Sequence, residues 1–196
     1  MAQAEEVRSQ KSGAGGKARR PTVPGAHRIE ALISEERIRA RVAELGRQIA
    51  RDYRGRDLVV VCVLKGSFVF TSDLVRAIDL PLAVDFLRMS SYGGGTESSG
   101  SVRLEFDVTQ PLKGKDVIVV EDIIDTGNTV RALLDTLSAK KPASLAVCAL
   151  LHKPEREQVH VPIDYLGFTI PNKFVVGYGL DHAGKHRNLP FVGVVG

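Results

Sequence analysis

Three continuous apolar runs mark the strongest strand signals in the chain. They lie within residues 58–64, 117–120 and 144–151, and the second reads Val-Ile-Val-Val. Unbroken runs rich in β-branched residues are typical of strands buried on both faces of a parallel sheet, whereas half-exposed strands alternate apolar and polar residues. These runs therefore predict the central strands of a parallel sheet.

Apolar residues at helical spacing precede the first run and lie between successive runs. A first amphipathic helix is predicted over residues 34–54, where Ser34 can serve as N-cap ahead of two glutamates. A second helix passes through residues 70–78, and a third runs from about residue 129 to about 140. Strand and helix patterns that alternate in this way indicate an α/β domain.

Weaker strand patterns complete the predicted elements. Residues 82–89 and 102–108 alternate apolar and polar side chains, so we expect a hairpin whose long tip, residues 90–101, is rich in Gly and Ser. A structureless tip of that length is usually a lid or a disordered insertion. Residues 163–170 and 191–195 are predicted to be short strands.

Composition and charge divide the chain into a tail and a body. The 196 residues are 43% hydrophobic, which is enough for the core of one domain. Six of the 27 Lys and Arg residues lie in residues 1–28, and the remaining 21 are balanced by 21 of the 23 Asp and Glu residues. We therefore expect residues 1–25 to be a disordered basic tail and residues 26–196 a single neutral domain without a nucleic-acid surface.

The apolar segments and the two cysteines of the sequence indicate where the protein is located and how its thiols behave. No apolar stretch reaches the roughly 18 residues of a membrane span, and the N-terminal region has no apolar segment of the kind found in secretion signals. These features predict a cytoplasmic protein. Cys62 and Cys148 lie inside apolar runs, so we interpret them as buried thiols rather than as a disulfide or metal ligands.

The residues after the second apolar run carry most of the candidate chemistry. Glu121, Asp122 and Asp125 supply carboxylates, and a helix pattern starts after Thr129. A helix N-terminus presents unpaired N–H groups that bind phosphate, and Gly127 permits a close approach. The segment therefore predicts a sugar-phosphate site in which carboxylates accept from ribose hydroxyls. The alternative is an acidic turn whose Asp and Thr residues only cap the helix.

Lys65 and Gly66 directly follow the first apolar run. Ligands gather at the carboxyl ends of strands in open α/β sheets, and an ammonium beside a bare glycine N–H suits an anion. Taken alone, a Lys-Gly pair after a strand is also an ordinary connecting turn.

Residues 121–129, Glu-Asp-Ile-Ile-Asp-Thr-Gly-Asn-Thr, resemble the 5-phosphoribosyl-1-pyrophosphate (PRPP) motif of the type I phosphoribosyltransferases, in the form of their hypoxanthine-guanine branch. The similarity extends from about His27 to the C-terminus over four separated motifs. It implies a parallel sheet flanked by helices, a small hood formed by the N-terminal segment and the C-terminal region, and a flexible β-hairpin lid. His182, where relatives frequently have an aromatic residue, and Asn128, often leucine, depart from the pattern and leave purine preference open.

The resemblance assigns roles at the sugar-phosphate end of the site. Asp125 is implied to be the general base that takes the N7 proton of the purine. Lys65, Gly66 and Arg187 are implied to bind pyrophosphate, in a loop whose peptide before the glycine is often strained or cis. The residues implied to hold the ribose and the 5′-phosphate are Glu121, Asp122, Asp125, Thr126, Gly127, Asn128 and Thr129.

A second set of implied roles concerns the purine, the metal and the lid. Lys153 is expected to donate to the 6-oxo group, Phe174 to stack on the base, and the backbone near Val175 to read its edge. Without the resemblance, the lysine is a solvated strand-end residue and the phenylalanine a core residue. Ser91 and Tyr92 are implied to form the lid. Mg²⁺ is the implied cofactor, held by Glu121, Asp122 and Asp181, the last of which also borders the purine.

The implied reaction is transfer of the phosphoribosyl group from Mg-PRPP to N9 of hypoxanthine, guanine or both, a step of purine salvage. The expected partners are PRPP, a 6-oxopurine and further copies of the chain in a dimer or tetramer, with no nucleic acid and no membrane. Two alternatives stay open. One is a regulator of the same fold that senses PRPP and binds nucleic acid, and the other is the same chemistry on xanthine, adenine or a pyrimidine.

Overall fold

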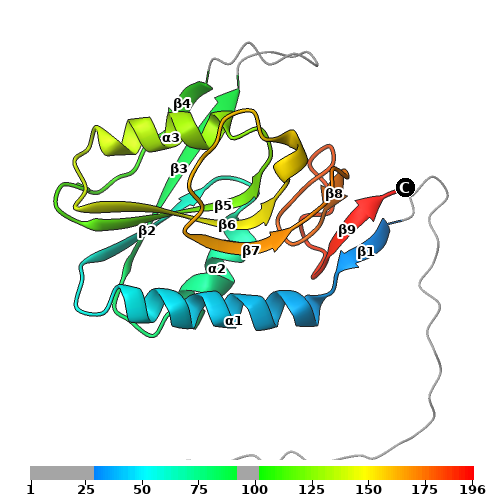
Figure 1. The fold of residues 1–196 in the computed structure, drawn as a ribbon, viewed down its shortest axis with the longest axis horizontal. Coiled ribbons are helices and arrows are strands. Elements are labelled where there is room, and N and C mark those ends of the chain that lie inside the picture. The colour runs from blue at the N-terminus through cyan, green and yellow to red at the C-terminus, as the bar shows by residue number, and fades with distance from the viewer. Residues whose placement is uncertain (1–28, 92–101) are drawn as a thin grey trace, which may run out of the picture.

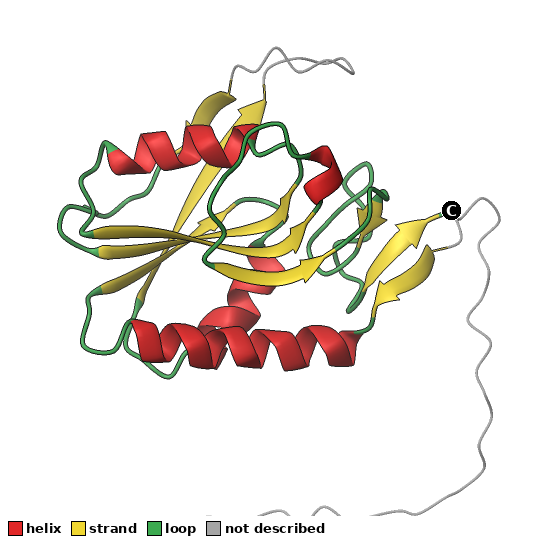
Figure 2. Ribbon diagram, in the orientation of Figure 1, coloured by secondary structure: helices red, strands yellow, loops and turns green. Residues whose placement is uncertain are grey.

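The structure is a computed structural model that describes residues 29–91 and 102–196. Figures 1 and 2 show a central sheet with helices on both sides and a small second sheet beside it. In chain order the elements are β1 (Ile29–Ile33), α1 (Glu35–Asp52), β2 (Leu58–Val63), α2 (Phe68–Ala77), β3 (Ala83–Ser91), β4 (Val102–Phe106), β5 (Asp116–Ile124), α3 (Asn128–Ser138), β6 (Ser144–His152), the 3₁₀ turn η1 (Pro154–Arg156), β7 (Tyr165–Thr169), β8 (Val175–Val176) and β9 (Val192–Val195).

The central sheet has six strands in the order β4-β3-β2-β5-β6-β7. All neighbouring pairs are parallel except β3 with β4, which pair antiparallel as expected for the predicted hairpin. Every residue of β2 is buried, because successive side chains point to opposite faces and both faces are covered. Val60 packs in the core on the side of α1 and α2, whereas Val59 and Val61 pack in the core on the side of α3. The unbroken apolar run thus has its physical explanation.

Helix α1 begins where the sequence pattern predicts. The Ser34 side chain accepts from the amide of Arg37, and two glutamates occupy the first turn, where the helix dipole favours negative charge. The apolar stripe of the helix is buried, with Ile38, Leu45 and Ile49 at most 1% exposed. Figure 1 shows α1 and α2 on one side of the sheet and α3 on the other.

The small sheet joins the two ends of the described chain. Its order is β1-β9-β8, and both pairings are antiparallel. It lies beyond the carboxyl ends of β6 and β7 in Figure 1. This sheet matches the predicted hood, built from an N-terminal segment and the C-terminal region.

Two local predictions were wrong by a few residues. The apolar run at residues 117–120 predicts a strand that ends before Glu121, but β5 continues to pair with β6 as far as Ile124 opposite His152. Both carboxylates therefore stand on the strand, and only Asp125 lies in the turn. In the Lys-Gly loop the cis peptide joins Leu64 to Lys65, one residue earlier than the position expected.

Some sequence predictions lie outside the described residues. The basic tail, residues 1–25, and the lid residue Tyr92 belong to this group, and Ser91 is placed only as the last residue of β3. Within residues 29–91 and 102–196, no helix combines the length and the apolar character that a membrane crossing requires.

Candidate active site

A cavity of about 350 Å³ opens at the carboxyl ends of β2 and β5. Three separate segments contribute charged or polar groups to it: the turn after β2, the end of β5 with the start of α3, and the loop before β9. The sequence-predicted residues that line it are Lys65, Gly66, Glu121, Asp122, Asp125, Thr126, Gly127, Thr129, Asp181 and Arg187. The other lining residues are apolar and were not predicted, because single apolar residues carry no recognisable signal for a site: Val63, Leu64, Met89, Ile123, Ile124 and Val130.

The turn between β5 and α3 has the geometry of a phosphate cradle. Gly127 is the N-cap of α3 in a left-handed conformation (φ 82°), and no side chain caps this helix. A Cβ at this position would overlap the carbonyl oxygen of Val159, so only glycine fits. The N–H groups of the first turn therefore remain available to a ligand. The alternative in which Asp and Thr side chains merely cap the helix is wrong.

The loop after β6 supports this cradle from behind. The amides of Gln158 and Val159 both donate to the carbonyl oxygen of Thr126, each at 3.0 Å. The Asn128 side-chain amide donates to the Gln158 side-chain oxygen at 3.3 Å, which accounts for an asparagine at this position. These bonds fix the cradle to a second strand-end loop.

Glu121 and Asp122 bring two adjacent carboxylates to the wall of the cavity. Burial, and then the charge of Asp122, raises the pKa of Glu121 well above its usual range. Burial also raises the pKa of Asp122 to about 6, although the amide of Ile123 and the Arg187 guanidinium oppose this shift. Cations and hydroxyl donors stabilise the ionised forms, so the pair is suited to bind ribose hydroxyls or a divalent cation.

The predicted pyrophosphate residues lie on two loops that pack against each other. Gly179 (φ 105°) approaches the carbonyl oxygen of Gly66 so closely that a Cβ would overlap it. Arg187 donates to the carbonyl oxygen of Gly179 at 2.6 Å and pairs with Asp181 at 2.5 Å. The second carboxylate oxygen of Asp181 accepts from the Gly184 amide at 2.7 Å. The loop before β9 thus holds the Arg187 guanidinium and the Asp181 carboxylate side by side.

Three of the residues predicted at the purine, Lys153, Phe174 and Val175, do not line this cavity. Lys153 is only 7% exposed, so the interpretation as a solvated strand-end lysine is wrong. Phe174 is 55% exposed and packs edge-on against His182, with ring centroids 5.3 Å apart, so it is no core residue either. Val175 begins β8 and is buried. This side of the molecule thus offers a buried lysine and an exposed aromatic ring.

The three predicted metal ligands do not form a ready-made metal site. In the described ranges no three His, Cys, Asp or Glu side chains are grouped closely enough to hold a metal ion. Glu121, Asp122 and Asp181 nevertheless line one cavity and offer the oxygen donors that Mg²⁺ prefers. Mg²⁺ usually takes one or two carboxylates and completes its shell with substrate phosphates and water, so the donor set fits a metal that arrives with its substrate.

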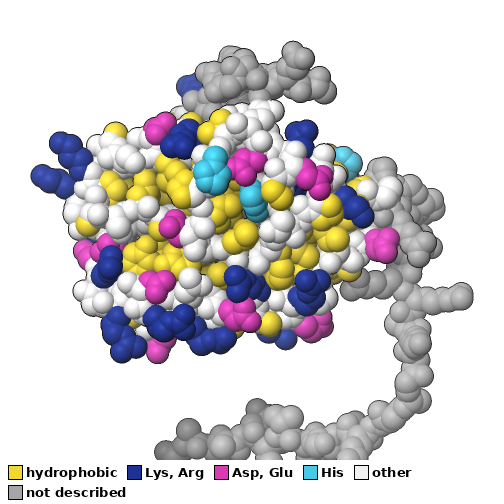
Figure 3. All heavy atoms as spheres, in the orientation of Figure 1, with side chains coloured by type: hydrophobic (Ala, Val, Ile, Leu, Met, Phe, Trp, Pro, Cys, Tyr) yellow, Lys and Arg dark blue, Asp and Glu magenta, His cyan; other side chains and the backbone are white. Residues whose placement is uncertain are grey.

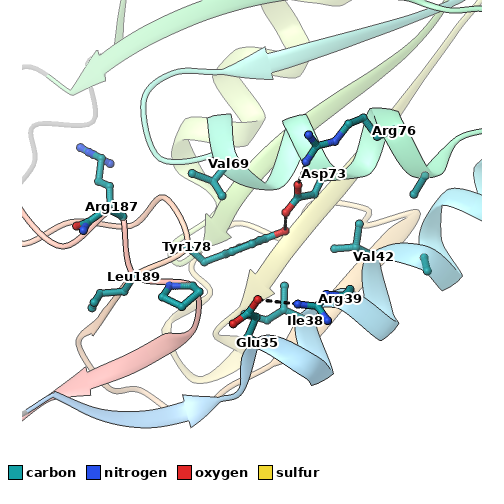
Figure 4. Close-up of a pocket in the computed structure, with 14 residues that line it drawn as sticks. Glu35, Ile38, Arg39, Val42, Val69, Asp73, Arg76, Tyr178, Arg187 and Leu189 are labelled. Atoms are coloured by element: carbon teal, nitrogen blue, oxygen red, sulfur yellow. Dashed lines mark hydrogen bonds and ion pairs between the residues drawn. The ribbon is translucent and has the colours of Figure 1, made fainter. Parts of the chain in front are cut away.

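A second cavity of about 570 Å³ lies between α1, α2 and the segment before β9 (Figure 4). Its charged groups are already paired: Arg39 with Glu35 at 2.6 Å, and Asp73 with both Arg76 and the Tyr178 hydroxyl. It lacks the helix N-terminus and the β5 carboxylates of the first cavity. We therefore assign the chemistry to the first cavity.

Comparison with known proteins agrees with this geometry. The family model "Phosphoribosyl transferase domain" matches residues 29–183. The chain belongs to the phosphoribosyltransferase family.

Within that family, the chain is similar to hypoxanthine and hypoxanthine-guanine phosphoribosyltransferases. The chain is 48% identical over 171 residues to the hypoxanthine phosphoribosyltransferase of Escherichia coli K12, a match that covers 86% of this chain and 96% of the relative. It is also 48% identical to the hypoxanthine-guanine phosphoribosyltransferase of Mycobacterium avium over 84% of each chain. The crystal structure of a hypoxanthine-guanine phosphoribosyltransferase from Bacillus anthracis superposes with a TM-score of 0.82 at 50% identity, covering 85% of this chain and 98% of that one.

Proposed function

We propose that this protein transfers the 5-phosphoribosyl group of PRPP to N9 of hypoxanthine, guanine or both, and so acts in purine salvage. The observation that carries the proposal is the convergence, in one cavity, of a phosphate-binding helix N-terminus, the carboxylates of Glu121 and Asp122, and the cations of Lys65 and Arg187. Similarity to purine phosphoribosyltransferases over most of the chain supports the same activity.

The donor substrate fits this arrangement group by group. The 5′-phosphate accepts from the N–H groups of residues 127–129 and from the hydroxyls of Thr126 and Thr129. The ribose hydroxyls donate to Glu121 and Asp122. The pyrophosphate lies between Lys65, the amide of Gly66 and Arg187. The positive charges of Lys65 and Arg187 stabilise it as it leaves. Glu121, Asp122 and Asp181 would hold Mg²⁺, which would supply further charge neutralisation.

The acceptor base fits the remaining residues. Phe174 stacks on the purine, which is worth about 1–3 kcal/mol for an aromatic residue on a base. The Lys153 ammonium donates to the 6-oxo group, and the backbone near Val175 reads the edge of the ring. The purine N9 attacks C1′ while the bond from C1′ to the pyrophosphate oxygen breaks, and the pyrophosphate leaves with the bonding electrons. The N7 proton moves to a carboxylate oxygen of Asp125, which acts as the general base.

The proposed setting is that of a cytoplasmic enzyme that works on small molecules and forms dimers or tetramers. Val84 and Phe86, two residues apart on β3, are 39% and 42% exposed, and Phe68 and Phe106 are also exposed. Val84 and Phe86 point to the same face of β3, and neighbouring exposed apolar residues favour contact with another protein surface, here a second copy of the chain. On the face in Figure 3, Lys and Arg side chains are interspersed with Asp and Glu, which favours small-molecule substrates over a nucleic-acid partner.

A base-panel assay tests the proposed function. The full chain is incubated with Mg-PRPP and hypoxanthine, guanine, xanthine, adenine or uracil, and the nucleotide and pyrophosphate formed are separated by chromatography. We expect equal amounts of the two products with hypoxanthine or guanine and little with adenine or uracil. Nucleotide formation with adenine or uracil alone, or with no base of the panel, would overturn the proposal.

A further inference from the structure

Asp125 is the one residue of the β5–α3 turn whose side chain forms an ion pair with another segment in the described structure. Its Oδ1 lies 3.1 Å from Nε of Arg156, a residue 31 positions later in the chain. This contact could not be predicted from the sequence, because an arginine in a short turn is normally a solvated residue.

Arg156 belongs to a turn that is fixed at both ends. The turn η1 begins with Pro154, and the amide of Arg156 donates to the carbonyl oxygen of Lys153 at 3.0 Å. The amide of Lys153 in turn donates to the carbonyl oxygen of Ile124 at 3.0 Å, next to Asp125 in the chain. Lys153 and Arg156 are thus the two ends of one turn, and the turn is anchored to the end of β5.

The ion pair contributes little to the stability of the fold. The side chains of Arg156 and Asp125 are 48% and 40% exposed, and exposed ion pairs are worth about 0–1 kcal/mol. Its effect is on orientation. Arg156 donates to Oδ1, which leaves Oδ2 of Asp125 as the oxygen with more of its lone pairs open to a proton, and the ion pair restricts the rotation of a partly exposed side chain.

We propose that Arg156 is a positioning residue for the transfer reaction: it holds the Asp125 carboxylate by Oδ1 so that Oδ2 faces the N7 proton of the purine. The proposal rests on the proposed function and deepens it. It also links the two ends of the base site, because the turn that presents Lys153 to the 6-oxo group presents Arg156 to the general base.

A double-mutant cycle on single-turnover rates tests this role. Each enzyme is mixed, in excess over its substrates, with Mg-PRPP and hypoxanthine, and nucleotide formation is followed in a quenched-flow instrument. The four enzymes compared are the wild type, Arg156→Ala, Asp125→Asn and the double variant. We expect Arg156→Ala to slow the step by about tenfold, the order of magnitude of a misplaced catalytic group. In the Asp125→Asn background the same change should alter the rate less than about twofold, because Arg156 acts through the carboxylate. Arg156→Lys should restore part of the rate.

A matched control comes from Arg131. Its guanidinium donates to the carbonyl oxygen of His160 at 2.9 Å, so it fastens the same loop without contacting Asp125. Arg131→Ala should change the rate less than about twofold, and the melting temperatures of both single arginine variants should match the wild type.

Each outcome separates the inference from the function on which it rests. If the wild type forms no nucleotide, the proposed function fails. If the wild type is active, the positioning role is overturned by an unchanged rate in Arg156→Ala, by equal losses in both backgrounds, or by equal losses in Arg131→Ala and Arg156→Ala.

Discussion

Gly66 and Asp122 lie against each other in the wall of the cavity, so closely that a Cβ added to Gly66 would overlap the Asp122 carboxylate. A loop residue from the end of β2 and a strand residue near the end of β5 are thereby fixed against each other. The contact brings the predicted pyrophosphate loop to the carboxylates that are predicted to bind ribose and magnesium.

Gly66→Ala should therefore impair PRPP binding more than folding. The added methyl group must displace the Asp122 carboxylate or the loop itself, and we expect the KM for PRPP to rise by about tenfold or more, a loss of more than 1.4 kcal/mol of binding. The control is Gly55→Ala, at a glycine with positive φ but open space around it. This control should lower stability by about 1 kcal/mol and leave the KM unchanged. Equal KM values in wild type and Gly66→Ala would show that the contact is unimportant.

Asp125→Asn should lower kcat by about 100-fold or more while it barely changes the affinity for PRPP. The amide keeps the shape of the carboxylate but cannot accept the N7 proton. Steady-state kinetics with hypoxanthine, together with PRPP titration by calorimetry, separate the two effects. Turnover near that of the wild type would rule out Asp125 as the general base.

Lys153→Gln should weaken selection for 6-oxopurines. An ammonium has only donors, so it satisfies a carbonyl oxygen but not an exocyclic amino group, whereas the glutamine side chain offers both a donor and an acceptor. We expect kcat/KM to fall for hypoxanthine and guanine and the discrimination against adenine to shrink. If kcat/KM for all three bases is the same as in the wild type, Lys153 does not contact the base.

The buried carboxylate of Asp85 should contribute stability that depends on pH. Burial by itself raises its pKa, but hydrogen bonds from the amides of Phe86, Gln110 and Thr109 outweigh that effect and lower the pKa. A group with a lowered pKa stabilises the fold above its unfolded value of about 3.9, and that contribution is lost as the pH falls through the folded value.

Asp85→Asn should accordingly reduce the free energy of unfolding by about 2 kcal/mol at pH 7, with the difference from the wild type narrowing below about pH 4. Urea unfolding at a series of pH values measures this directly. Asp79→Asn, at an exposed aspartate, is the control and should change stability little at any pH. A difference that stays constant down to pH 3 would show that the ionised form of Asp85 is not what stabilises the fold.

The elements that could be predicted from the sequence are those whose signals are local. Helix α1 carries its cap, its first-turn charges and its apolar stripe within 20 consecutive residues, and β2 is an unbroken apolar run. The motif at residues 121–129 likewise places its carboxylates and its helix start in one stretch. Local patterns of this kind are read without knowledge of the rest of the fold.

The features that could not be predicted depend on pairs of residues far apart in the chain. β5 extends past residue 120 as far as Ile124 because it pairs with β6, and this pairing overrides the polar character of Glu121 and Asp122. Asp85 is buried because its partners arrive from a turn 24 residues later, and Arg156 meets Asp125 only through the folded loop. No periodicity within one segment records such contacts.

The most direct test of the central claim is a crystal structure of the protein with bound inosine or guanosine monophosphate. The account predicts the 5′-phosphate against the amides of residues 127–129, the purine ring on Phe174, and the 6-oxo oxygen within about 3.2 Å of Lys153 Nζ. A nucleotide bound in the cavity between α1 and α2, or seated with its phosphate away from the N-terminus of α3, would contradict the assignment of the site.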